Sequence, residues 1–466
     1  MLLRPPDIDV PKEAPFQYDL LGRAEQSLAA RELISQADTP LVISLNAPWG
    51  QGKTTFLKMW KQDLENSHIP CIYFNAWEND FSSDAFTSLL SEIGLGIQGL
   101  FSNKQPAISS GLAKAKQVGV KLIKSAAPGI LKAATMGAID IDKALEETIG
   151  KAAEKWAEEQ LKCYEESKKS VGAFRERLGD LVKEIEGKEQ YKLPLVVIID
   201  ELDRCRPTFA IQLLERAKHF FNVKGLVFVV SIDKQQLGHS IQAVYGEKFD
   251  VEGYLLRFFD LEWRLPQVGQ SKYAKALFSK FGLEDYFSRR QGESSRYDRS
   301  NFEKLFEELF QLFQLTLREQ EFCFRCLTVV AKSTSEKYKI FPHLTAFMIV
   351  LRLKNSDLYS QFSQHDADTE VIFNYLKTLS GGQKFLLEHN GIVLEAQLVT
   401  CRHGSKYDVK AKMKSYDEIA KNQILTQEDR ERAAFILRMI QGAEWDRETG
   451  NLSHIVHKIE VASKLS

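Results

Sequence analysis

The chain has 466 residues, of which 44% are hydrophobic and 27% charged. This is the composition of a globular protein with room for about two or three domains, and it excludes a disordered chain, a fibrous protein and a small disulfide-stapled domain. Lysine and arginine (62) nearly balance aspartate and glutamate (63), leaving a net charge of -1. Any attraction to nucleic acid or to a membrane therefore has to come from a local patch.

The six cysteines are spread thinly and lack the spacing of a disulfide framework, and the amino end lacks the apolar stretch of a secretory signal. No window reaches the ~18 consecutive apolar residues that a membrane-spanning helix needs. We therefore expect a cytoplasmic chain with no integral membrane segment.

Four short apolar runs have the length of buried parallel strands; they lie at 41–45, 69–74, 195–199 and 226–230. One helical pattern separates the first two runs and another separates the last two, which predicts a parallel sheet covered by helices on both faces. The stretch between the second and third strands is too long for a simple crossover, so we expect a helical insertion there.

After Pro266 the periodicity is mainly helical, although the pattern of 392–398 also suits a strand. The predicted fold class is α/β, with a three-layer parallel sheet, a helical insertion and a mostly α-helical carboxyl-terminal domain. The predicted parts are the first half of the core at 15–93, the insertion at 94–190, the second half of the core at 191–268 and the helical domain at 269–466.

A glycine-rich turn follows the first strand and opens a helix, which is where a phosphate-binding loop belongs. Gly50 and Gly52 allow backbone N–H groups to approach phosphate oxygens closely, and the amino end of the helix adds partial positive charge. Ala47 stands where the usual pattern has its first glycine, and it requires a negative φ. The predicted nucleotide-binding residues of this loop are Pro48, Trp49, Gly50, Gln51, Gly52, Lys53, Thr54 and Thr55.

Lys53 is expected to reach the β- and γ-phosphates, and Thr54 to bind Mg²⁺. The third strand ends in two adjacent acids, Asp200 and Glu201. A carboxylate at the end of a strand beside the phosphate loop can hold magnesium, which gives Asp200 that role together with Thr54. Glu201 is placed to orient or deprotonate the attacking water.

Taken together, several stretches of the sequence resemble the KAP family of P-loop NTPases. They are Gly22–Arg23, Trp49–Thr54, Phe74–Trp77, Asp200–Cys205, Ser231–Asp233 and Gly253–Phe259. The resemblance implies an NTPase of the additional-strand type that uses ATP and Mg²⁺ and works as a conformational switch, in a homo-oligomer or with a partner effector protein. Several bacterial members of the family are linked to anti-phage defence. Many members carry transmembrane helices in the insertion, whereas the insertion of this chain has no apolar segment of that length.

The resemblance also implies roles for further residues. Gly22 and Arg23 would flank the adenine, and Asp233 would sense the γ-phosphate. A cation that stabilises the transferring phosphoryl group greatly accelerates hydrolysis, so an arginine finger is expected. Arg257 is the first candidate, followed by Arg204, Arg216, Arg318 and Arg325. Trp77 is expected to be an ordinary core aromatic.

Two features of the insertion leave other functions open. Residues 104–138 carry lysines and no acidic residue, a pattern that suits a solvated helix face, a peripheral contact with anionic lipid or a contact with nucleic acid. Apolar residues between 145 and 185 follow heptad spacing, which indicates helices that pack on each other or on the core. The alternatives are therefore a nucleotide-gated interaction module with negligible turnover and a nucleic-acid-stimulated ATPase.

Two local motifs are read as structural. Residues 379–383 spell the signature of ABC transporters but lie far downstream of both acids, so we expect a loop between helices. Cys323 and Cys326 form a solitary pair in an apolar helical pattern, which favours core packing over metal binding.

Overall fold

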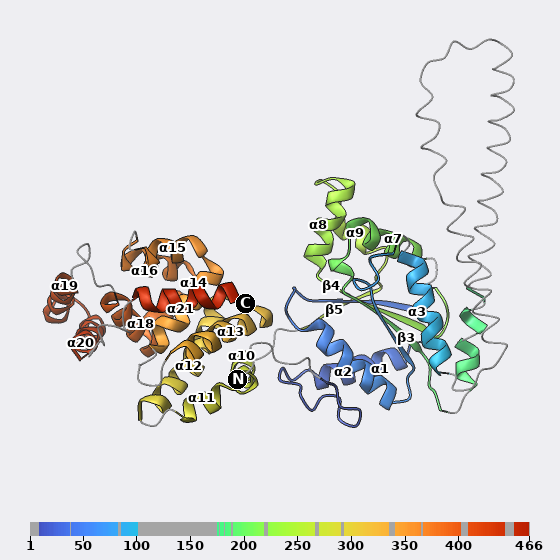
Figure 1. Ribbon diagram of the computed structural model, residues 1–466. Coiled ribbons are helices and arrows are strands. Elements are labelled where there is room, and N and C mark those ends of the chain that lie inside the picture. Colours follow the sequence, from blue (N-terminus) through green and yellow to red (C-terminus); the bar gives the residue numbers. More distant parts are fainter. Residues whose placement is uncertain are drawn as a thin grey trace, which may run out of the picture. The chain divides into compact units, whose positions relative to one another are not determined.

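The computed structural model describes residues 9–465 except 38, 83–84, 101–174, 177, 181, 188–189, 219–221, 266–269, 290–292, 335–340, 365–366, 402–408 and 443–451. The chain divides into two compact units, one of Ile8–Pro266 and one of Gln267–Ser466. The first is built around a parallel sheet and the second is helical (Figure 1).

The sheet has five strands in the order β2-β3-β4-β1-β5, and every neighbouring pair is parallel. The strands are β1 (Leu41–Asn46), β2 (Cys71–Asn75), β3 (Leu195–Asp200), β4 (Leu226–Ile232) and β5 (Leu261–Arg264). β4 lies between the strand that enters the glycine-rich loop and the strand that ends in Asp200. This arrangement is the α/β fold expected from the sequence, with one strand, β5, more than the apolar runs predicted.

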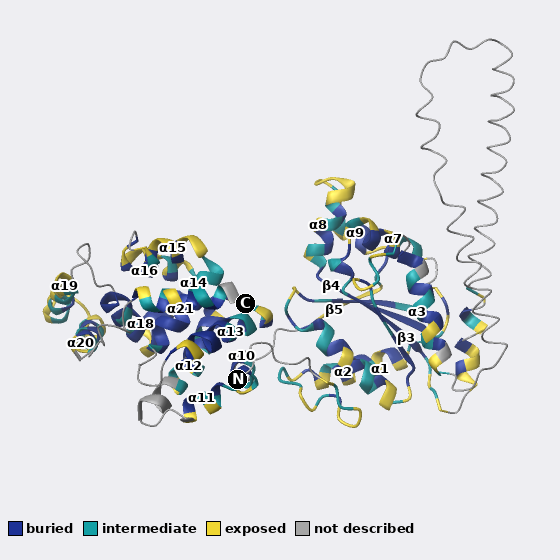
Figure 2. Ribbon diagram, viewed as in Figure 1, coloured by how far each residue is buried: buried dark blue, intermediate teal, exposed yellow. Residues whose placement is uncertain are grey.

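Alternate side chains of the strands face two separate apolar cores, as the period-2 geometry of a strand requires. On β3, Val196 and Ile198 belong to the core beneath α1 (Ala24–Ser35) and α2 (Lys53–Asn66). Val197 and Ile199 belong to the core on the opposite face. The helices on that face are α3 (Ala85–Leu100), α7 (Pro207–Ala217) and α8 (Lys234–Tyr245), and the short α9 (Val251–Leu255) follows them. The three layers follow directly from this alternation. Figure 2 shows the central strands of the sheet as a buried layer.

Most of the insertion lies outside the described residues, including all of the basic segment 104–138 and most of the heptad stripe. The described part contains Leu178, Val182 and Ile185, which are buried in the core shared by α3 and α7. This end of the stripe therefore packs on the α/β core.

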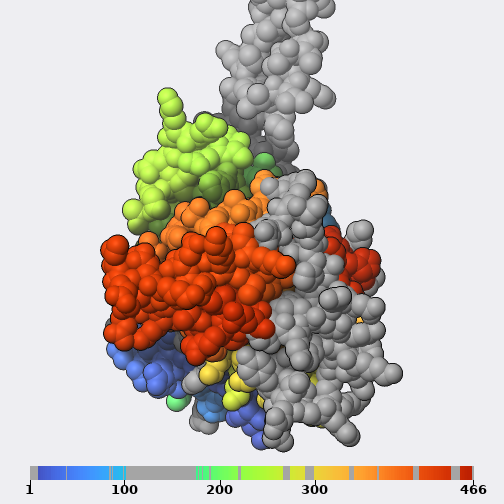
Figure 3. Space-filling model, turned by 90° about the vertical axis from the view of Figure 1, so that its left-hand side faces the viewer, coloured from blue at the N-terminus to red at the C-terminus, as the bar shows by residue number. Residues whose placement is uncertain are grey.

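The second unit consists of helices around one large core rich in phenylalanine. They are α10 (Gln270–Lys280), α11 (Leu283–Arg289), α12 (Glu293–Leu312), α13 (Leu317–Ser333), α14 (Pro342–Lys354), α15 (Ser356–Ser363), α16 (Thr369–Thr378), α17 (Gly382–Leu387), α18 (His389–Thr400), α19 (Val409–Lys421), α20 (Gln427–Gly442) and α21 (Leu452–Leu465). A smaller core joins α18 to α19 and α20, whose outer side chains form part of the surface seen in Figure 3.

The strand suggested at 392–398 is wrong, because these residues lie within α18. Leu394 and Leu398 pack into the large core, whereas Ala396 and Val399 pack into the smaller one. A helix that contacts two cores is apolar on more than one face, and its sequence then loses the one-sided helical periodicity.

The two local motifs behave as expected. Residues 379–381 form the turn between α16 and α17, and Gly382 and Gln383 begin α17. Gly381 has a φ of 84° at the amino end of α17. Cys323 and Cys326 are buried on α13 in the large core.

Candidate functional site

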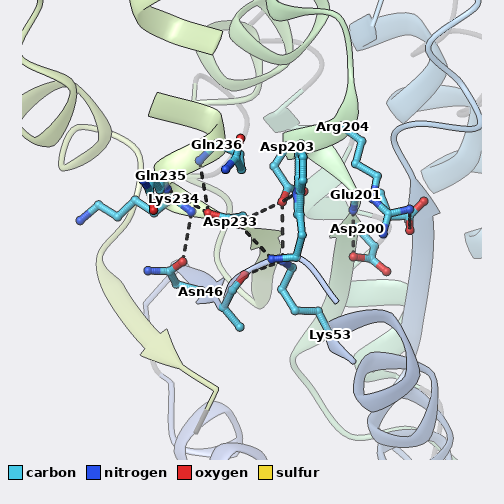
Figure 4. A network of polar contacts seen from close by, with 12 residues as sticks. Asn46, Lys53, Asp200, Glu201, Asp203, Arg204, Asp233, Lys234, Gln235 and Gln236 are labelled. Atoms are coloured by element: carbon cyan, nitrogen blue, oxygen red, sulfur yellow. Dashed lines mark hydrogen bonds and ion pairs between the residues drawn. The ribbon is translucent and has the colours of Figure 1, made fainter. Parts of the chain in front are cut away.

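The carboxyl ends of three adjacent strands bring the candidate residues to one edge of the sheet (Figure 4). Lys53 begins α2 directly after the loop that follows β1, Asp200 ends β3 and is followed by Glu201, and the residue after β4 is Asp233. In an open parallel sheet, this is the edge at which ligands bind.

The loop after β1 depends on two glycines in the left-handed conformation. Gly50 has a φ of 77°, and Gly52, which caps the amino end of α2, has a φ of 76°. Side chains other than glycine adopt this conformation only with strain. Ala47 is not one of the described residues with positive φ; it is buried, and its N–H donates to the carbonyl oxygen of Ile232 at 3.2 Å. The loop therefore needs its glycines at positions 50 and 52 and accepts alanine at 47.

Lys53 is the first residue of α2 and is only 9% exposed. Its Nζ donates to the carbonyl oxygen of Ala47 at 2.6 Å and lies 3.6 Å from Oδ2 of Asp203. Burial lowers the pKa of Lys53, and the nearby carboxylates, Asp203 first, act in the opposite direction. The ammonium group is thus held inside the site by partners from its own chain.

Asp203 lies in a single turn of 3-10 helix, η1 (Leu202–Arg204), and is buried. Its Oδ2 accepts from Nε1 of Trp49 and from the backbone N–H of Asp233, both at 2.7 Å. Asp203 was not among the site residues predicted from the sequence, although it lies shortly after the two acids at the end of β3. Asp203 is a third acid close to the Asp200–Glu201 pair, and this closeness is the sequence signal that could have indicated it.

Asp233 connects the loop to the following helix. Its Oδ2 accepts from the backbone N–H of Trp49 at 3.0 Å, and its Oδ1 accepts from Gln235 and Gln236 in the first turn of α8. The carboxylate therefore caps α8 and also holds the backbone of the loop after β1.

Asp200 is fully buried at the end of β3. Its Oδ2 accepts from the hydroxyl of Tyr73 at 2.7 Å, and its Oδ1 accepts from the N–H of Glu201 at 2.8 Å. Burial, followed by the negative charge of Asp200, raises the pKa of Tyr73, which keeps this hydroxyl a donor. A carboxylate has about four lone-pair sites, so this one can still accept from water or bind a cation.

Glu201 has an unusual backbone conformation, with a φ of 60°. Its Oε1 forms an ion pair with Nη1 of Arg204 at 2.6 Å, and Nδ2 of Asn75 lies 3.4 Å from its Oε2. Residues of β2 and η1 thus fix the direction of the carboxylate. A left-handed non-glycine residue beside candidate catalytic groups is typical of a functional site.

The oxygen donors of the site fit magnesium. Asp200 offers a buried carboxylate, and Thr54 offers a hydroxyl in the first turn of α2. Among the described residues, no cluster of three or more His, Cys, Asp or Glu side chains is arranged to hold a metal ion. Magnesium commonly binds through one or two protein oxygens, with water and substrate phosphates completing its shell, and this donor set suits that mode.

Arg23, at the amino end of α1, supports the loop after β1. It is 3% exposed, and its Nη2 and Nη1 lie 2.9 Å and 3.4 Å from the carbonyl oxygens of Gln51 and Gly52. Burial lowers the pKa of Arg23 to about 10. Asp19 accepts from the backbone N–H groups of Leu21, Arg23 and Ala24, which fixes the turn at Gly22, where φ is 67°. Arg23 therefore reaches the loop itself, and Gly22 forms the turn that precedes it.

The candidate arginine fingers occupy different surroundings. Arg204 is in the site, paired with Glu201. Arg257 is exposed after α9 and makes no ion pair within the described part of the chain. Arg216 lies in the last turn of α7, and Arg318 and Arg325 lie on α13 of the helical unit.

Trp77 is not a core residue, which corrects the expectation from the sequence. It is 53% exposed in the turn after β2, and the guanidinium carbon of Arg204 lies 5.8 Å from the centre of its ring. A cation over an aromatic face can hold an exposed tryptophan in place without burying it.

Residues 23–403 match the family model described as KAP family P-loop domain, and no curated protein matches the chain. A structure of Drosophila ORC bound to DNA aligns with a TM-score of 0.35 and 12% identity, over 97% of this chain and 88% of that one. The Aeropyrum pernix ORC2 protein, in ADPNP-ADP complexes, aligns with a TM-score of 0.31 and 12% identity, over 94% and 95%. Among the described residues, no helix is both long and apolar enough to cross a membrane.

Proposed function

Because the chain belongs to the KAP family of P-loop NTPases, we propose that it binds ATP with Mg²⁺ at the loop after β1 and hydrolyses it. The observation that carries the proposal is the meeting of three groups at one sheet edge. They are the glycine-shaped loop with Lys53, the Asp200–Glu201 pair and Asp233. Each has a separate task in phosphoryl transfer.

In the proposed mechanism, the loop N–H groups and the amino end of α2 bind the phosphates, and Lys53 leaves Ala47 to bind the β- and γ-phosphate oxygens. Thr54 and Asp200 would hold Mg²⁺, which neutralises charge that develops on the phosphates. Glu201 orients the attacking water, and the direction of the Glu201 carboxylate is set by Arg204 and Asn75. Asp233 senses the γ-phosphate through its bond to Trp49.

The proposal extends to a conformational switch. Asp233 is bonded both to the loop and to α8, so a change at the phosphates reaches a helix directly. Arg257 is exposed, which suits a finger supplied to the site of a second copy in a homo-oligomer. From the family resemblance, the proposal also includes action in bacterial anti-phage defence, in the cytoplasm.

A second candidate is a nucleotide-gated interaction module with negligible turnover. One observation favours it: the Glu201 carboxylate already accepts a charge-assisted hydrogen bond from Arg204. A water molecule has to compete with this partner before Glu201 can orient it.

Nucleotide binding and single-turnover hydrolysis, measured on the same preparations, separate the two candidates. Lys53→Ala should weaken ATP binding at least tenfold, and Glu201→Gln should keep the affinity but lower the hydrolysis rate by about 100-fold. Lys61→Ala is the matched control, because Lys61 lies on the same helix and forms an ion pair with Glu65 near the surface. Tight ATP binding with a rate that Glu201→Gln leaves unchanged would favour the interaction module. Binding unaffected by Lys53→Ala would contradict both.

A further inference from the structure

Asp203 has no task in the proposed mechanism, yet it contacts three parts of the site (Figure 4). Its side chain is 1% exposed. The same oxygen, Oδ2, accepts from the indole of Trp49 in the loop and from the backbone of Asp233 after β4, and it lies 3.6 Å from Nζ of Lys53 in α2. One carboxylate oxygen thus joins the loop, α2 and the end of β4.

The energetics of burial make these contacts consequential. A desolvated carboxylate is strongly unfavourable unless donors and an opposite charge surround it, and the same is true of the ammonium of Lys53. Asp203 and Lys53 satisfy each other in part, and Trp49 and Asp233 supply the donors. Breaking one contact leaves the other groups less well compensated, so the conformation of the loop is coupled to Asp203.

The position of Trp49 supports this coupling. Trp49 is 41% exposed, so burial alone does not account for the orientation of its side chain. Both of its N–H groups are bonded to acids of the site, the indole to Asp203 and the backbone to Asp233. The tip of the loop is therefore fixed at two points by carboxylates.

We propose that Asp203 is a positioning residue of the nucleotide site. Its carboxylate anchors the loop through Trp49 and supplies the counter-charge of Lys53 until the phosphates of ATP replace it. The inference rests on the proposed function. It assigns Asp203 two separable tasks, one as hydrogen-bond acceptor and one as negative charge.

Two substitutions at this position separate the tasks. Asp203→Asn keeps a carbonyl oxygen for Trp49 and Asp233 but removes the charge that competes with ATP for Lys53, so ATP should bind about fivefold more tightly. Asp203→Ala removes the anchor as well, so ATP should bind about tenfold more weakly. Trp49→Phe, at a half-exposed position, removes the indole donor alone and should also weaken ATP binding.

The experiment combines the dissociation constants of ATP with acrylamide quenching of tryptophan emission in the absence of nucleotide. The emission of Trp49 is obtained as the difference between each protein and the same protein carrying Trp49→Phe. Quenching of Trp49 should increase in Asp203→Ala and stay unchanged in Asp203→Asn. Circular dichroism of each variant verifies that the fold is kept.

A residue needed only for folding would give changes of the same sign in both variants. If Asp203→Asn and Asp203→Ala weaken ATP binding alike, or if Asp203→Ala leaves Trp49 quenching unchanged, the proposal is overturned. A full chain that binds no ATP would instead contradict the proposed function, and the quenching comparison would still decide whether Asp203 anchors the loop.

Discussion

Individual backbone conformations explain why this phosphate loop tolerates one departure from the usual pattern. The left-handed positions are Gly50 and Gly52, whereas Ala47 is a buried residue at the end of β1 with a bond to Ile232. The conformational demand for glycine falls on two positions of the loop and not on the third.

This difference gives a matched pair of substitutions. Gly52→Ala should cost about 1 kcal/mol of stability because its φ of 76° is strained for alanine, and it should weaken ATP binding about tenfold by displacing the loop N–H groups. Ala47→Gly should change the ATP dissociation constant less than twofold. Isothermal titration calorimetry measures the ATP dissociation constant of both variants. Equal losses of affinity in the two variants would contradict the assignment of the glycine requirement to position 52.

At the residue scale, the sequence indicated Lys53 because it follows a glycine-rich turn and opens a helix, and it indicated Asp200 and Glu201 because they stand at a strand end. Covalent proximity to a recognisable element places such residues without knowledge of the packing. The bond from Arg23 to the carbonyl oxygen of Gln51 joins residues 28 positions apart. The bond from Trp49 to Asp203 joins residues 154 positions apart. Such contacts depend on how helices and turns pack, which a local pattern does not contain.

Among the elements, α13 shows how a helix start is stabilised in the helical unit. The Thr316 hydroxyl accepts from the N–H of Glu319 at 3.3 Å, and the Glu319 carboxylate accepts from the N–H of Thr316 at 2.7 Å. This capping box satisfies two donors that the first turn of a helix otherwise leaves without partners.

Removing the cap should destabilise the helical unit measurably. Thr316→Ala should lower the free energy of unfolding by about 1 kcal/mol. Thr378→Ala is the control, because the Thr378 hydroxyl is exposed and only donates to the carbonyl of Tyr375, and its effect should stay within about 0.5 kcal/mol. Urea denaturation followed by circular dichroism compares them, and equal midpoints for the two variants would argue against the cap.

The elements that could not be predicted have specific physical reasons. β5 is exposed at most of its four positions, so its sequence lacks an apolar run, and it is recognised only by its pairing with β1. α18 is buried by two cores and resembles a strand in its apolar content. By contrast, the four buried strands follow from the sequence because each is a short apolar run, and α2 follows because its buried residues recur with helical spacing.

Considering the whole molecule, the two units have separate cores, so changes inside the helical unit can be followed on their own. His343 is fully buried on α14, and its Nε2 lies 3.0 Å from Oδ1 of Asn390. Nδ2 of Asn390 donates to Oε1 of Glu308. Nδ1 of His343 has no hydrogen-bond partner in the described part of the chain. Burial lowers the pKa of His343 to about 4.

A buried neutral histidine makes stability depend on pH. The unfolded chain takes up a proton near pH 6.5, whereas the folded chain resists until about pH 4, so stability should fall as pH decreases through this window. The loss should reach about 3 kcal/mol. Burial raises the pKa of Glu308, which acts in the opposite direction, so His343→Gln is needed to isolate the histidine. The difference in unfolding free energy between the two proteins should change with pH from 7 to 4, and a constant difference would refute this.

Lys53 has to leave the carbonyl oxygen of Ala47, 2.6 Å away, before its ammonium can bind a phosphate. Association with ATP therefore contains a step that takes place within the protein after the first collision. In kinetic terms, the observed association rate should rise with ATP concentration and then reach a plateau set by that rearrangement, instead of growing without limit. The loop that recognises the nucleotide also limits how quickly it can be occupied.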